Sequence, residues 1–66
     1  MENLIRSERE LRGWTQVVLA ERLEVSRQTI VALETGKYDP SLPLAFRIAC
    51  LFEKPIEGLF FPANNS

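Results

Sequence analysis

The 66-residue sequence contains no histidine and only one cysteine, Cys50. Transition-metal sites are built largely from these two residue types, and a catalytic nucleophile needs a base beside it. The carboxylates are scattered and mostly lie near arginines, so neither kind of site can be assembled from them. We therefore expect no catalytic residue, no metal and no cofactor, and predict that the protein is not an enzyme. The lone cysteine excludes an internal disulfide and fits a reducing, cytoplasmic location.

Long apolar runs are also missing. No stretch approaches the roughly 20 residues of a membrane span, and the N-terminus lacks the apolar region of a signal peptide. The composition, 45% hydrophobic and 26% charged, is that of an ordinary globular protein. A chain this short forms one domain and buries only about 60% of the surface that it exposes when unfolded. We expect modest stability.

An excess of positive charge is the third absence. The net charge is −1 and the isoelectric point about 5.3, whereas domains that bind nucleic acids are often basic. Eight lysines and arginines are nevertheless present. Their positions on the surface, more than their sum, decide whether the protein can attract a polyanion.

Capping residues and helix breakers predict five helical segments. They span residues 4–12, 16–23, 27–35, 42–52 and 55–60. Asn3, Thr15, Ser26 and Ser41 are suitable N-caps, Gly13 and Gly36 suit left-handed helix ends, and Pro55 opens the last segment. No alternation typical of a strand stands out. The prediction is an all-α domain over residues 1–66, with a core from about 4 to 60 and a tail at 61–66.

The middle of the chain has the pattern of a helix-turn-helix. Two short helices are joined by a turn of two or three residues at Glu24-Val25, and a tight turn sets the crossing angle of such a unit. If Ile30 and Leu33 face inward, Arg27 and Gln28 face outward, and these side chain types pair with guanine and adenine edges. A plain helical hairpin with a solvated face would show the same composition, so composition alone leaves both interpretations open.

Three segments resemble the Cro/C1-type (XRE) helix-turn-helix regulators. Gly13–Leu23 (GWTQVVLAERL) is similar to the second helix of that family, Val25–Ile30 (VSRQTI) to its turn and recognition helix, and Leu33–Leu42 (LETGKYDPSL) to the following loop. The resemblance extends from about residue 4 to 60. It implies a five-helix, lambda-repressor-like DNA-binding domain whose second and third helices form the helix-turn-helix.

The resemblance also implies a role for individual residues. Arg27, Gln28 and Ala32 take base-contacting positions, Ala32 offering only a methyl group. The implied contacts to the DNA backbone are Gln16, Ser26, Thr29, Lys37, Tyr38 and Arg47. The carboxylates of the terminal segments, Glu2, Glu10, Glu53 and Glu57, would then face away from the DNA, which reconciles the acidic net charge with DNA binding.

Arg9 and Glu34 match a family pair that forms a buried, structural salt bridge. Three departures from the family pattern suggest marginal stability. Glu24 stands where glycine is frequent and a positive φ is expected, Val18 stands where a glutamate would complete a capping box with Thr15, and Glu8 replaces an apolar residue and should thin the core.

The apolar residues exceed what the predicted core uses. That core comprises Ile5, Leu19, Ala20, Leu23, Val25, Ile30, Leu33, Leu42, Ala45, Phe46, Ile48, Ala49 and Phe52, with Trp14 packed over the first two helices. Val17, Val18, Leu44, Cys50, Leu51, Leu59, Phe60 and Phe61 are left over. Leu59 and Phe60 are the first candidates to fold back into the core. Leu51, Leu59, Phe60 and Phe61 are also the predicted dimer interface. Cys50 is expected to be a small apolar filler.

The expected function is sequence-specific binding of double-stranded DNA by a transcriptional regulator. The resemblance favours a repressor that inserts its third helix into the major groove, as a homodimer on a palindromic operator. Two alternatives use the same fold: the antitoxin of a toxin–antitoxin pair and the controller protein of a restriction-modification system. No binding site for a small-molecule effector is evident.

Overall fold

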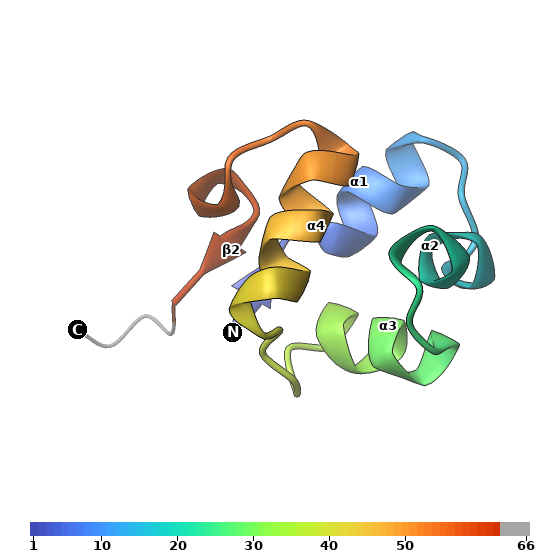
Figure 1. Cartoon of the computed structure of the whole chain (residues 1–66), viewed down its shortest axis with the longest axis horizontal. Coiled ribbons are helices and arrows are strands. Elements are labelled where there is room, and N and C mark those ends of the chain that lie inside the picture. The colour runs from blue at the N-terminus through green and yellow to red at the C-terminus, as the bar shows by residue number, and fades with distance from the viewer. Residues whose placement is uncertain (63–66) are drawn as a thin grey trace.

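The computed structural model of the protein describes residues 1–62, and over this range the chain folds into four α-helices, a 3₁₀ helix and two short strands (Figure 1). In chain order they are β1 (Glu2–Asn3), α1 (Ile5–Leu11), α2 (Gln16–Leu23), α3 (Arg27–Glu34), α4 (Leu42–Phe52), η1 (Ile56–Gly58) and β2 (Phe60–Phe61). None of the helices in this range is long and apolar enough to cross a membrane. The helical character agrees with the sequence prediction, and α2 and α3 match it nearly to the residue.

The predicted fifth helix, at residues 55–60, forms only in part, as the 3₁₀ helix η1 (Ile56–Gly58). Only one 3₁₀ turn forms there, and the chain becomes extended again at Phe60. Pro55 supplies the extended residue before the turn and has no N–H to donate. The turn ends at Gly58, only three residues after Pro55. So short a segment forms only i→i+3 hydrogen bonds, such as the 2.9 Å bond from the Gly58 amide to the Pro55 carbonyl.

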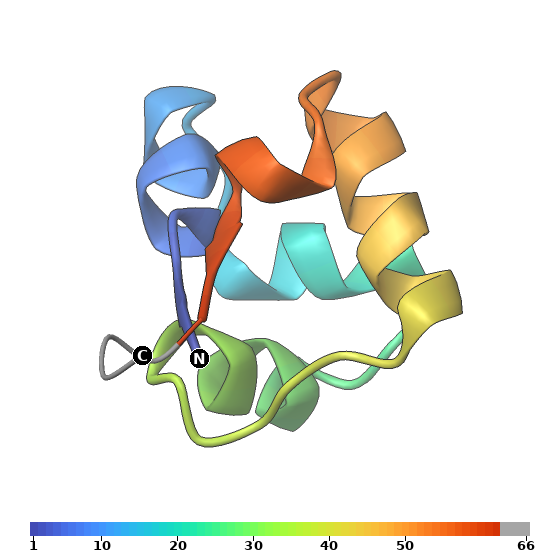
Figure 2. The same ribbon diagram turned by 90° about the vertical axis from the view of Figure 1, so that its left-hand side faces the viewer.

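A strand pair that the sequence did not predict joins the two ends of the described chain. Strands β1 and β2 are antiparallel, with Glu2 opposite Phe61 and Asn3 opposite Phe60. The two strands run side by side between α1 and α3 (Figure 2). Two-residue strands are too short to show an alternation of apolar and polar residues, so the sequence does not predict them. Phe61 therefore belongs to a strand and not to a tail, and residues 63–66 of the predicted tail lie outside the described range.

Hydroxyl caps start three of the helices as predicted. The side chains of Thr15, Ser26 and Ser41 accept hydrogen bonds from the third backbone amide of the following helix at 3.1, 3.1 and 3.3 Å. Asn3 acts one residue too early to be the cap of α1, since Leu4 holds that position. Its Oδ1 still accepts from the Ile5 amide at 3.1 Å, and its Nδ2 donates to the Leu33 carbonyl at 2.7 Å. Asn3 thus ties β1 to α3.

The buried face of α4 differs from the predicted one. Leu44, Ala45, Ile48, Ala49 and Phe52 are buried, a stripe at i, i+1, i+4, i+5 and i+8. Leu42 and Phe46, predicted as core, are 65% and 58% exposed. Leu44, which had no predicted place in the core, is buried instead. Arg47 is the one charged residue of α4 (LPLAFRIACLF), and a helix with apolar residues on nearly every side does not mark its buried face, so the sequence could not fix the rotation of α4 about its axis.

A charged cluster fills the place where the core was expected to be thin. The Glu8 side chain is buried, and its carboxylate lies 2.7 Å from Nη1 of Arg12 and 3.4 Å from Nζ of Lys54. Arg12 in turn donates from Nη2 to the Phe52 carbonyl at 3.0 Å, with its guanidinium 4.7 Å from the Phe52 ring centroid. Trp14 stacks on Phe52 at 6.1 Å, so it packs against α4. The cluster ties α1 to the end of α4.

The hydrogen bond from Arg12 lowers the pKa of the Glu8 carboxyl below its ordinary value of 4.5, against the opposing effect of burial. A carboxyl with a depressed pKa stabilises the fold fully above its unfolded pKa and loses this contribution as the pH falls through its folded pKa. We expect Glu8→Gln to lower the urea midpoint near pH 7, and the deficit to shrink steadily below about pH 4.5. Urea titrations of both proteins between pH 2 and 7 measure this, and a deficit independent of pH would contradict the ionic role of Glu8.

Candidate nucleic-acid interface

Helices α2 and α3 form the helix-turn-helix that the sequence predicted. The turn between them depends on Glu24, whose φ of 59° places it in the left-handed region, as expected for a position where glycine is frequent. A left-handed glutamate costs on the order of 1 kcal/mol. The next amide, of Val25, donates to the Ala20 carbonyl at 3.0 Å and completes the end of α2. Val25 is half-buried against the core and anchors the turn.

The outer side of α3 carries the predicted base-contacting residues. Ile30 and Leu33 are fully buried, and the rotation this imposes leaves Arg27 and Gln28 exposed in the first turn of the helix. Ala32 lies one turn further along and is half-buried, and Val31 is exposed beside it. Arg27 and Gln28 therefore have room to reach a groove, whereas Ala32 presents only part of its methyl surface.

The predicted backbone-contacting residues come from several parts of the chain. Ser26 and Thr29 lie together at the start of α3, their hydroxyls 3.0 Å apart. Lys37 and Tyr38 are exposed in the loop that follows α3. Arg47 is exposed on α4, a separate element. The start of α3 and the loop after its end thus present polar groups at both ends of one helix, and Arg47 stands apart from them in the chain.

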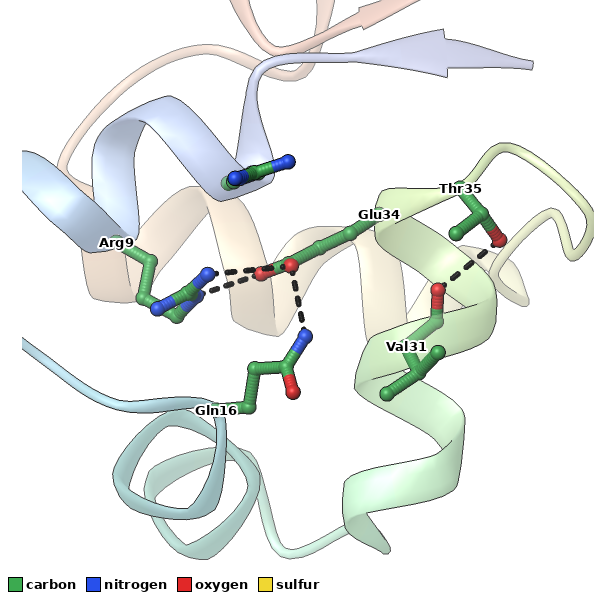
Figure 3. Close-up of a pocket in the computed structure, with 6 residues that line it drawn as sticks. Arg9, Gln16, Val31, Glu34 and Thr35 are labelled. Atoms are coloured by element: carbon green, nitrogen blue, oxygen red, sulfur yellow. Dashed lines mark hydrogen bonds and ion pairs between the residues drawn. The ribbon is translucent and has the colours of Figure 1, made fainter.

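Arg9 and Glu34 form the predicted ion pair, joining α1 to α3 (Figure 3). Nε of Arg9 lies 2.7 Å from one Glu34 oxygen and Nη2 lies 3.3 Å from the other. Both side chains are nearly buried, and the remaining Arg9 nitrogen, Nη1, donates to the Trp14 carbonyl at 2.9 Å. The bond to Glu34 raises the pKa of Arg9 above its ordinary value. Every nitrogen of this guanidinium is engaged.

Gln16, the predicted phosphate contact, is the third member of this network. Its Nε2 donates to Oε1 of Glu34 at 3.1 Å, so one carboxylate joins the first turn of α2 to α1 and α3 (Figure 3). Gln16 and the ion pair were separate predictions from the sequence, and the bond between Gln16 and Glu34 was not predicted. Arg6, which lines a cavity with Gln16 and Glu34, had no predicted role. Four residues before Glu10, Arg6 has the spacing of an ordinary solvated helix pair, so no signal in the sequence singled it out.

The predicted dimer residues differ in accessibility. Leu59 is completely buried and Phe60 is nearly so, both within the core of the same chain, and they cannot form an interface in this conformation. Leu51 is half-buried, and Phe61 is 38% exposed. The strand pair explains why Phe60 and Phe61 differ: successive residues of a strand point to opposite sides, so Phe60 packs against the body of the protein and Phe61 points outward.

An apolar groove of about 440 Å³ lies beside these residues. Its lining comes from the N-terminus, the start of α4, η1 and β2: Met1, Pro40, Leu42, Ala45, Ile56, Glu57, Phe60 and Pro62. Phe46 follows Leu42 by one turn of α4 and is also exposed. Within residues 1–62, no group of three or more histidine, cysteine, aspartate or glutamate side chains is arranged to hold a metal ion.

Comparison with known proteins identifies similar chains. A helix-turn-helix family model matches residues 5–59. The chain is 55% identical over 60 residues to an uncharacterized HTH-type transcriptional regulator of Methanocaldococcus jannaschii, covering 91% of each. It is 56% identical over 61 residues to one of Methanothermobacter thermautotrophicus, covering 91% of this chain and 88% of the relative. The Bacillus subtilis HTH-type transcriptional regulator YgzD is 39% identical over 61 residues, 92% of each.

Removing Glu34 should strand the Arg9 charge in a nearly buried position. We expect Glu34→Ala to cost about 3–5 kcal/mol of the free energy of unfolding. Glu10→Ala is the matched control, because its exposed pair with Arg6 is worth less than about 1 kcal/mol. Urea titrations at neutral pH measure both losses, and equal midpoints for the two variants would disprove a structural role for the buried pair.

Proposed function

The chain belongs to the Cro/C1-type (XRE) helix-turn-helix family of DNA-binding transcriptional regulators, and from that premise we propose that it is a repressor that binds a palindromic operator as a homodimer. Helix α3 enters the major groove. The observation that carries this proposal is the exposed pair Arg27 and Gln28 on a helix whose opposite side is locked into the core.

The chemistry of the two side chains suits base recognition. Arginine donates two hydrogen bonds to the N7 and O6 atoms of guanine, and glutamine both donates to and accepts from adenine. The Ser26 cap supports both, because it fixes the first turn of α3 from which they project. Val31 and Ala32 can add contacts to a thymine methyl group.

Repression follows from occupancy. A regulator seated in the major groove over promoter DNA excludes the polymerase from the same site, without any separate effector function. Contacts to the backbone from Gln16, Ser26, Thr29 and Lys37 would fix the register of α3. Tyr38 and Arg47 are proposed as further phosphate contacts because both are exposed.

Apolar exposure supports the homodimer. Leu42 lines the apolar groove and is exposed, and Phe46 and Phe61, beside the lining residues Ala45 and Phe60 in the chain, are exposed as well. Exposed apolar surface of this kind is typical of an association surface. A two-fold interface uses the same surface on both copies. Phe46 of each protomer can therefore insert into the apolar groove of the other. A two-fold dimer would place two α3 helices about 34 Å apart, one turn of DNA.

Selection from random double-stranded DNA should yield a palindromic consensus. By fluorescence anisotropy the wild type should bind this site with nanomolar affinity, and the double variant Arg27→Ala with Gln28→Ala should lose it by at least about 100-fold, since each bidentate pair contributes about 1–3 kcal/mol. Both residues are exposed, so the melting temperature should not change. Recovery of no consensus, with only salt-sensitive micromolar binding, would refute sequence-specific recognition.

Sedimentation equilibrium should show a dimer for the wild type at micromolar concentration. Phe46→Gln should weaken association by about 10-fold or more, because Phe46 is 58% exposed in the monomer and an aromatic side chain buried at an interface contributes strongly to binding. Val17→Gln is the matched control: Val17 is also exposed, but on α2. If both variants associate like the wild type, the dimer does not use this surface.

A further inference from the structure

A polar cavity of about 280 Å³ lies between α1, α2 and α3. Arg6 and Arg9 line it from α1, Gln16 from α2, and Val31, Glu34 and Thr35 from α3. Figure 3 shows the side chains of Gln16 and Glu34 meeting across it. Its size is slightly below that of pockets for drug-sized ligands, which are about 300–1,000 Å³ and mostly apolar. A small polar group suits it better.

The side chains that line the cavity carry one more positive than negative charge, on a protein whose net charge is −1. Two arginines and one glutamate line it, and Arg9 already neutralises Glu34. Arg6 therefore supplies the excess charge. Its partner outside the cavity is Glu10, at 3.0 Å, and the two side chains are 71% and 54% exposed. An ion pair this exposed contributes little to stability, so an incoming anion can replace Glu10 as the partner of the Arg6 guanidinium.

The amide of Gln16 has a fixed orientation. A carboxylate can only accept, so the nitrogen and not the oxygen of the Gln16 amide must face Glu34. The nitrogen carries two hydrogens, and one of them remains for a second acceptor. Thr35 offers no comparable donor, because its hydroxyl is directed at the Val31 and Ala32 carbonyls at 3.0 and 3.1 Å.

The cavity is also next to the proposed DNA-binding side of α3. Val31 and Thr35, on its rim, follow Arg27 at intervals of four residues and so share its stripe of the helix. When Arg27 reaches into a major groove, the sugar-phosphate strand that borders this groove passes the same stripe. Gln16 and Arg6 are the lining donors of α1 and α2 that keep N–H groups for a phosphate, because each guanidinium nitrogen of Arg9 already donates.

We propose that this cavity receives a DNA phosphate, with Arg6 as a contact and Glu34 as a positioning residue that holds the Gln16 amide ready for it. The inference rests on the proposed DNA-binding function and adds two residues to it. Arg6 brings the charge. Glu34 does not attract the phosphate, and Arg9 neutralises its charge. Its hydrogen bond orders the Gln16 side chain before DNA binds, so less conformational entropy is lost on binding.

The contact by Arg6 is tested through the salt dependence of binding to the selected operator. Arg6→Gln should bind several-fold more weakly at 0.1 M salt, and its log–log slope should be less steep by about 0.9 for each protomer. Lys54→Gln removes the same charge, but Lys54 lies beyond the end of α4 against Glu8, so its slope should equal that of the wild type. Equal slopes for both variants would overturn the role of Arg6.

The positioning role is tested without DNA, by NMR relaxation of the side-chain amides. The Gln16 side-chain amide should be ordered, with an order parameter well above 0.6, since values below 0.6 indicate flexible groups. Gln28, exposed on α3, is the internal control and should fall below that value. Equal mobility of the two amides would overturn the role of Glu34. A wild type that selects no DNA consensus would instead overturn the proposed function, while leaving this measurement unaffected.

Discussion

The Glu34 carboxylate is the junction on which the arrangement of the first three helices depends. It accepts from Arg9 of α1 and from Gln16 of α2 while belonging to α3. A nearly buried charge is tolerable only when its hydrogen-bonding capacity is filled and an opposite charge neutralises it. Those demands are directional. They fix where the start of α2 and the end of α3 stand relative to α1, which apolar packing alone would leave adjustable by small rotations.

Helix α1 is held in this way on two sides. Its buried residues are Ile5, Glu8 and Arg9, so only one of them is apolar. Arg9 joins it to α3, and Glu8 with Arg12 joins it to the end of α4. A 66-residue chain has little apolar area to bury, and α1 compensates with two satisfied polar clusters. Its position is therefore specified by charge geometry, and it should be the element most sensitive to pH.

The parts that could be predicted from sequence are those with a local chemical signature. Thr15, Ser26 and Ser41 act within three residues of their own position, which is why the starts of α2, α3 and α4 were accessible. The Arg9–Glu34 pair came from the family resemblance and not from spacing. The errors concern non-local choices: the rotation of α4, where every candidate was apolar, and the strand pair, which depends on the two ends of the domain meeting. The bond between Gln16 and Glu34 is of the same kind.

The acidic net charge limits how the protein can hold DNA. All eight cations lie within residues 1–62, but Arg9 and Arg12 are engaged in nearly buried pairs, Lys54 lies against Glu8, and Arg22 stacks over the Trp14 ring at 4.4 Å. This leaves Arg6, Arg27, Lys37 and Arg47, all exposed. Arg27 is assigned to a base, so at most three cations per protomer can neutralise phosphates. At about 0.9 per phosphate, the ionic part of the salt slope cannot much exceed 3 for each protomer. Under the proposed function, a protein with so few free cations would derive most of its operator affinity from Arg27, Gln28 and dimerisation, and its non-specific binding would be correspondingly weak.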